Sequence, residues 1–272
     1  MTVSEPFKAN VHKQTVFFLI GLAGSLILLG VVISGASIEH MRMVQSYTKL
    51  FPDSLWQFIN LFGHFLVAAL MLLVLMPKAV ALWALLLATI VGGGLTRLLK
   101  FSLHHPRPAA LMSEDLHLIG ETLWGQSMPS GHTMTIAIVF ALICACCSEL
   151  SLPARRLRFV LGFLVIAVGL ARMASGAHWP ADVCVGAGVG MLVGLFCAYL
   201  ILRLQSRLPR IDGLVPMARL VLALILIVMP LPPSCSAQGS IALGFAFIVW
   251  QFIQRQYAQR PWSPRLNSNR QL

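Results

Sequence analysis

Charged residues are scarce in this chain of 272 residues, in which Asp, Glu, Lys and Arg make up 11% against 58% hydrophobic residues. A soluble domain carries about a quarter charged residues. Acidic residues are the rarest, with nine Asp and Glu against twenty Lys and Arg. This shortage of charge excludes an ordinary soluble domain and predicts an integral membrane protein.

The net charge of +11 does not indicate a nucleic-acid partner. The basic residues stand between apolar runs and do not gather on one helix face, as they do in proteins that bind nucleic acid. Lys and Arg in the loops of membrane proteins instead set the orientation of the chain. We therefore expect the membrane, and no nucleic acid, as the partner of this protein.

The six cysteines also exclude two features. All but Cys235 lie inside apolar runs, where a cysteine acts as a small hydrophobic residue, so no disulfide between loops is expected. Cys144, Cys146 and Cys147 look like a metal cluster only superficially, because no histidine lies near them in the sequence. The sequence predicts no metal and no cofactor.

Eight apolar runs are present, and a span needs about 20 residues. The runs cover residues 15–34, 54–76, 79–99, 131–147, 159–171, 183–204, 220–231 and 241–252. The expected fold is an all-α polytopic membrane helix bundle. The first run has a cleaved signal peptide as its alternative, and the short last two runs have a re-entrant hairpin as theirs.

A polar stretch between the fifth and sixth runs contains Arg172, then His178 after five residues and Asp182 after three more. A neutral imidazole can attack phosphorus, a carboxylate can fix its tautomer, and a guanidinium can hold phosphoryl oxygens. Pro180 suits the first turn of the following helix, which would place Asp182 near its third position. A polar connector that only caps the next helix is the alternative.

Two further polar patches precede it. Residues 129–132 read Pro-Ser-Gly-His at the start of the fourth run, where unpaired helix amides attract anions and His132 could protonate a leaving oxygen. An ordinary serine cap is the alternative. Lys100 and Arg107, separated by six residues, open the longest connector; they could equally be interfacial anchors.

The loop charges predict which side of the membrane holds these patches. With the N-terminus in the cytoplasm, fourteen of the twenty basic residues face inward, which favours cytoplasmic N- and C-termini. All three patches then share the outer face. The six outward basic residues are Arg42, Lys49, Arg97, Lys100, Arg107 and Arg172.

Together the three patches resemble the signature of the type-2 phosphatidic acid phosphatase family, which shares a site with vanadium haloperoxidases. That signature is Lys-x6-Arg-Pro, Pro-Ser-Gly-His and Ser-Arg-x5-His-x3-Asp, and it matches residues 100–108, 129–132 and 172–182. Ala171 departs from it, at a supporting position where the family often has serine. The resemblance covers roughly residues 95–200.

The resemblance implies that His178 is the nucleophile, that Asp182 orients it, and that His132 is the general acid. It implies a phosphohistidine intermediate and no metal. The groups that would hold the phosphoryl oxygens are Lys100, Arg107, Ser130, the Gly131 amide and Arg172.

The resemblance also divides the chain. Residues 1–210 would form a six-helix phosphatase core, residues 211–255 an added C-terminal helical hairpin, and residues 256–272 a polar tail. His64 is interpreted as a packed histidine of the second run. Other polar residues of the first outer connector stay unassigned, as surface histidines, a lid or an interfacial belt: His104, His105, Glu114, Asp115, His117, Glu121 and Trp124.

The expected function is a metal-independent membrane lipid phosphatase of a bacterial inner membrane, acting on a phosphomonoester or pyrophosphate at the periplasmic leaflet. Undecaprenyl pyrophosphate, phosphatidylglycerol phosphate, phosphatidic acid and lipid A phosphates are candidate substrates. A lipid phosphotransferase that uses the same phosphohistidine is the first alternative. An anion transporter is a second, disfavoured because the runs carry few charges away from one end.

Overall fold

The structure is a computed structural model that describes all residues except 1–12, 35–36, 77, 113, 147–151 and 259–272. Every regular element among the described residues is helical, which confirms the all-α prediction. The elements are α1 Lys13–Ile33, α2 Ser37–Thr48, α3 Asp53–Asn60, the 3₁₀ turn η2 Leu61–Gly63, α4 Phe65–Leu75, α5 Lys78–Leu87, the π-helical turn η3 Ala88–Gly92, α6 Gly93–Leu103, α7 Pro108–Met112, α8 Gly131–Cys146, α9 Leu152–Ala174, α10 Pro180–Leu204, the 3₁₀ turn η4 Asp212–Leu214, α11 Val215–Val228 and α12 Ala237–Ala258.

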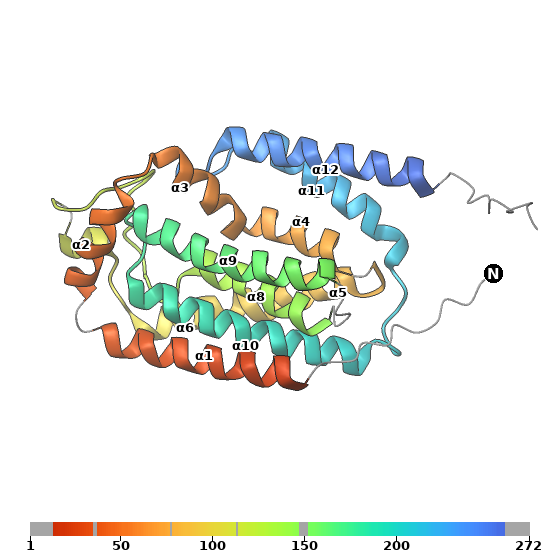
Figure 1. Ribbon diagram of the computed structural model, residues 1–272, viewed down its shortest axis with the longest axis horizontal. Coiled ribbons are helices and arrows are strands. Elements are labelled where there is room, and N and C mark those ends of the chain that lie inside the picture. Colours follow the sequence, from red (N-terminus) through yellow and green to blue (C-terminus); the bar gives the residue numbers. More distant parts are fainter. Residues whose placement is uncertain (1–12, 35–36, 77, 113, 147–151, 259–272) are drawn as a thin grey trace, which may run out of the picture.

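Helix α8 lies at the centre of the bundle. Almost every residue from Thr133 to Cys146 is buried, so the helix is apolar on all sides, as expected when other helices surround it. Helices α9 and α10 pack against α8, and α1 packs against α10 (Figure 1). In contrast, α1 exposes Phe17, Phe18 and Val32 on its outer side, which is where an apolar side chain would meet lipid.

Glycines let α10 approach its neighbours closely, as the small-residue pattern predicts. A Cβ atom on Gly186 would lie 2.7 Å from the carbonyl oxygen of Ser130, and one on Gly190 would lie 2.5 Å from that of Met134. On another side of the helix, a Cβ atom on Gly188 would lie 2.6 Å from the carbonyl oxygen of Ala23 in α1. Backbone-to-backbone packing of this kind is typical of membrane helices.

Among the described residues, four helices or helical segments are long and apolar enough to cross a membrane: Lys13–Ile33, Val80–Met112, Arg155–Ala174 and Pro180–Leu204. The pair Asp53–Gly63 and Phe65–Leu75 makes a fifth if its 58° bend lies within one span. Helix α8 and the segment Ala237–Ile248 are apolar but shorter. Of the eight predicted spans, four or five are therefore long enough among the described residues to cross a membrane. The hairpin of α11 and α12 stays a predicted addition.

The polar connectors gather at one end of the bundle, beside α2 and the start of α3 (Figure 1). The side chain of Gln45 in α2 hydrogen-bonds to the backbone of His117 through both its amide nitrogen and its oxygen. Arg42 forms a 2.7 Å ion pair with Asp115. These contacts fasten the long connector over the end of the bundle, whereas α1 begins and α12 ends at the opposite end.

Candidate active site

The turn between α9 and α10 presents the first predicted patch. Gly176 has a φ of +70°, and a Cβ atom there would lie 2.7 Å from the carbonyl oxygen of His117, so glycine is required on both counts. Trp179 is fully buried, and its Nε1 donates a 2.7 Å hydrogen bond to the carbonyl oxygen of Pro106. The tight turn thus sets His178 just before the first turn of α10.

The His178 and Asp182 side chains meet as the sequence predicts. Asp182 is the third residue of α10, where its carboxylate accepts a 2.8 Å hydrogen bond from the Trp179 amide. The same oxygen, Oδ2, lies 3.5 Å from Nδ1 of His178. An N–H on Nδ1 therefore points to the carboxylate, which leaves the Nε2 lone pair free for attack on phosphorus.

Two residues that the motif analysis did not assign also bind this carboxylate. Nδ1 of His105 lies 3.0 Å from Oδ1 of Asp182, and the Ser127 hydroxyl donates to Oδ2. Ser127 is completely buried and also lies 3.4 Å from Nδ1 of His178. His105 was left unassigned as a surface histidine, but the structure turns its ring into the site.

Burial keeps His178, the predicted nucleophile, neutral. Only 3% of His178 is exposed, and this desolvation lowers its pKa from 6.5 to about 3, against the opposing effect of Asp182. The neighbouring Arg172 and Arg107 also disfavour a charged ring. His178 is consequently an imidazole with an available lone pair at neutral pH, as nucleophilic attack requires.

The three predicted cations lie at this site, and they differ in how many of their N–H donors already have a partner. Arg172 is 2% exposed, and its Nε and Nη1 atoms have no hydrogen-bond partner within the described part of the chain. Arg107 donates a 2.7 Å hydrogen bond to the carbonyl oxygen of Ala177, and the same Nη1 lies 3.5 Å from Nε2 of His178. Arg107 and Arg172 are thus placed to meet an anion at the nucleophilic nitrogen.

Lys100 is partly committed to the protein. Its Nζ donates to the carbonyl oxygens of Gln126, at 2.7 Å, and Ser127, at 3.1 Å. An ammonium group has three donors, so one remains for a phosphoryl oxygen. These two bonds also hold the connector segment that carries the Ser127 hydroxyl against Asp182.

The start of α8 brings in the second predicted patch. The Ser130 amide donates a 3.0 Å hydrogen bond to the carbonyl oxygen of Asp182. The Ser130 hydroxyl oxygen lies 3.0 Å from the hydroxyl oxygen of Thr133. Gly131 begins the helix, where the first amides lack intrahelical acceptors and face an anion. The predicted Gly131 amide is therefore the better placed donor, and the Ser130 hydroxyl can still turn towards an anion.

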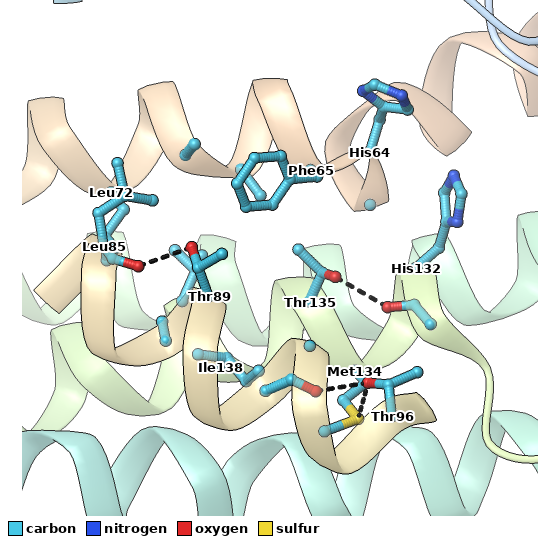
Figure 2. A pocket seen from close by; sticks show the side chains of 18 of the residues that line it. His64, Phe65, Leu72, Leu85, Thr89, Thr96, His132, Met134, Thr135 and Ile138 are labelled. Carbon is cyan, nitrogen blue, oxygen red and sulfur yellow. Dashed lines mark hydrogen bonds between the residues drawn. The ribbon is translucent and has the colours of Figure 1, made fainter. Parts of the chain in front are cut away.

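His132, the predicted general acid, lies beside His64 at the start of α8. Its ring faces that of His64 with centroids 6.2 Å apart, and it lies within electrostatic range of Arg172, His178 and Arg107. Figure 2 shows both imidazoles at one end of a groove of about 420 Å³ between α4, η3, α6 and α8. The rest of the groove is mostly hydrocarbon, lined by residues such as Leu72, Leu85 and Ile138.

A neutral histidine oriented by a carboxylate, two arginines, a lysine, a helix N-terminus and a second histidine together define a site for phosphoryl transfer. The helices around it define a membrane protein. Within the described residues, no group of three His, Cys, Asp or Glu side chains is arranged to hold a metal ion. The predicted phosphoryl ligands are thus brought together at the polar end of a membrane bundle.

Residues 81–206 match the model of the PAP2 superfamily, the type-2 phosphatidic acid phosphatases that the motifs of this chain resemble. No curated protein matches the chain in a sequence search. The matched range contains all three patches but ends before the hairpin of α11 and α12. This match supports the class of membrane phosphatase.

Among solved structures, the chain is similar to the crystal structure of a transmembrane PAP2-type phosphatidylglycerolphosphate phosphatase from Bacillus subtilis. The match has a TM-score of 0.52 and 19% sequence identity, and it covers 71% of this chain and 98% of the other. At this sequence identity, the similarity supports only the fold. It confirms the membrane helical bundle.

Proposed function

We propose that this protein is a lipid phosphatase that works through a phosphohistidine on His178. The observation that carries the proposal is the buried Arg172, whose unpaired guanidinium lies with Arg107 beside the neutral nucleophile. A buried cation without a partner is costly, and an anionic phosphoryl group would offset that cost. The motif residues supply the remaining donors.

The reaction follows from these positions. Nε2 of His178 attacks phosphorus while Arg107, Arg172, Lys100 and the Gly131 amide neutralise the phosphoryl oxygens. As the P–N bond forms and the P–O bond breaks, His132 gives its proton to the leaving oxygen. Water then attacks the phosphohistidine and returns a proton to His132, and phosphate leaves as the P–N bond breaks. No step requires a metal ion.

The groove beside His132 supports a lipid as the leaving group. It runs from the two imidazoles along α8 from His132 to Val139, a length of about 10 Å at the rise of an α-helix. Its far part is hydrocarbon, so a chain attached to the leaving oxygen would find an apolar path. Phosphatidic acid, phosphatidylglycerol phosphate, undecaprenyl pyrophosphate and lipid A phosphates all have such a chain.

The site is proposed to face the periplasm of a bacterial inner membrane. The excess of basic residues favours the opposite end, at which α1 begins and α12 ends, as the cytoplasmic side. Cysteine accessibility can test this. A cysteine introduced at the exposed Trp124 should react with an impermeant thiol reagent on intact cells, and a cysteine at Lys13 should react only after lysis.

Phosphate release from the four candidate lipids in detergent tests the activity, with and without EDTA. Wild-type protein should release phosphate equally in both, and His178→Ala should release none. His104→Ala, at an exposed neighbour of the site, is the matched control and should keep full activity. Loss of activity with EDTA would contradict the mechanism, and radiolabel that passes from donor lipid to acceptor lipid would indicate a phosphotransferase instead.

A further inference from the structure

His64 lies in the break between η2 and α4, where the second apolar run bends by 58°. Its ring and that of His132 meet at an interplanar angle of 63°. A Cβ atom on Gly63 would lie 2.7 Å from Cβ of His132, so the glycine lets this break approach the start of α8. The bend therefore holds one imidazole over the other, at the polar end of the groove (Figure 2).

Each ring has a buried nitrogen that lacks a partner within the described residues, Nδ1 in His64 and Nε2 in His132. Buried polar atoms are nearly always hydrogen-bonded. Ring centroids 6.2 Å apart leave the nitrogens of the two rings at least about 4 Å from each other, too far for a direct hydrogen bond. That gap suits a single bridging water.

We propose that His64 is a positioning residue that stabilises the protonated form of His132 through a bridging water. This role rests on the proposed phosphatase function. A histidine that acts as a general acid carries two N–H groups, of which one serves the leaving oxygen and the other needs an acceptor. Arg172 can only donate, and no described residue lies within hydrogen-bond distance of Nε2 of His132. The neutral ring of His64 supplies the acceptor.

The proton balance keeps His64 out of the covalent steps. His132 loses one proton to the leaving oxygen and regains one from the water that cleaves the phosphohistidine. His64 accepts the other N–H of His132 throughout and transfers nothing. Its effect should therefore be confined to substrates whose leaving oxygen needs a proton.

Two substitutions of nearly equal size separate this role from packing. His64→Leu removes the acceptor, whereas His64→Asn places an amide oxygen close to the position of Nδ1. The measurement is kcat/KM, which covers the steps up to departure of the leaving group, for dioctanoyl phosphatidic acid and for 4-nitrophenyl phosphate. The nitrophenolate ion leaves without a proton, so it reports catalysis without the general acid.

We expect His64→Leu to lower kcat/KM about tenfold on the lipid and less than about twofold on 4-nitrophenyl phosphate. His64→Asn should restore most of the activity on the lipid. His132→Ala provides the reference, with a larger loss and the same preference between substrates. His64→Phe, which keeps a ring of similar shape, replaces the leucine variant if that variant does not fold.

Equal losses on both substrates, equal losses for His64→Leu and His64→Asn, or no loss at all would overturn the role of His64. In those cases an active wild-type protein leaves the phosphatase function intact. A wild-type protein that is inactive on both substrates would overturn the proposed function, and the role of His64 with it.

Discussion

His105 lies closer to the Asp182 carboxylate than His178 does, with Nδ1 3.0 Å from Oδ1 against 3.5 Å from Nδ1 of His178 to Oδ2. One carboxylate with no exposed side-chain area thus joins two imidazoles, one on each oxygen. His105 follows His104, whose φ of 45° ends α6 in a left-handed conformation and turns the chain towards the site. The carboxylate beside the proposed nucleophile is thus itself held in place by a second histidine.

Replacing His105 should slow the chemical step and leave binding almost unchanged. His105→Phe removes a donor to Asp182, and we expect kcat to fall about tenfold with little change in KM, since the ring lies behind the carboxylate. His105→Asn keeps an N–H near the same position and should lose less. His104→Phe is the control, and steady-state kinetics on a lipid phosphate make the comparison. A rise in KM alone would place His105 at the substrate instead.

Removing Arg172 should increase stability and destroy activity. Its guanidinium is buried, and its Nε and Nη1 have no hydrogen-bond partner among the described residues, so Arg172→Met should raise the free energy of unfolding by about 1–3 kcal/mol without ligand. Turnover should fall at least about 100-fold, because the phosphoryl oxygens lose a charged donor. Inorganic phosphate should raise the melting temperature of the wild type and not of the variant. A destabilised variant would mean that Arg172 has a structural partner.

The stability of the protein should depend on pH through His178. Its pKa of about 3 in the folded state lies below the value of 6.5 expected in the unfolded state, so the unfolded chain binds more protons between these values. Stability should therefore be fully present above pH 6.5 and fall by up to about 1.4 kcal/mol per pH unit below it, levelling off near pH 3. Thermal unfolding of the wild type and His178→Asn between pH 4.5 and 8 gives the difference. Parallel curves would exclude a depressed pKa.

A methyl group added at Gly186 should displace the start of α8, which carries the candidate anion site. The new Cβ atom would lie 2.7 Å from the carbonyl oxygen of Ser130, which must then move together with the start of α8. We expect Gly186→Ala to lower both thermal stability and kcat/KM, by about tenfold for the latter. Gly94→Ala is the matched control, since nothing lies within 4 Å of its added Cβ atom. Equal behaviour of the two variants would mean that α10 moves aside without cost.

The sequence predicted the relative positions of candidate site residues best where the motif has a fixed spacing. His178 and Asp182 are four residues apart, and the proline-led helix start between them places one beside the other. Ser127 and His105 were not assigned, because they lie in a connector whose path has no periodic pattern. Only the tertiary fold brings them to Asp182. The sequence feature that could have pointed to them was the large number of His, Asp and Glu residues in this long connector.

The second apolar run was predicted as a single span, whereas the structure bends it at Gly63 and His64. Hydrophobicity alone does not reveal such a break, since the apolar run continues on both sides of residues 63 and 64. A titratable residue beside a glycine inside a span was the available sign, because polar groups in spans usually have a function.

Asp182 is used twice, once through its side chain and once through its backbone. The carboxylate faces His178, while the carbonyl oxygen accepts the Ser130 amide at 3.0 Å. Any axial shift of α10 would therefore carry the attacking ring and the phosphate-binding helix terminus in the same direction. The two halves of the reaction centre are mechanically linked through one residue, so the distance between nucleophile and anion would survive deformation of the surrounding membrane.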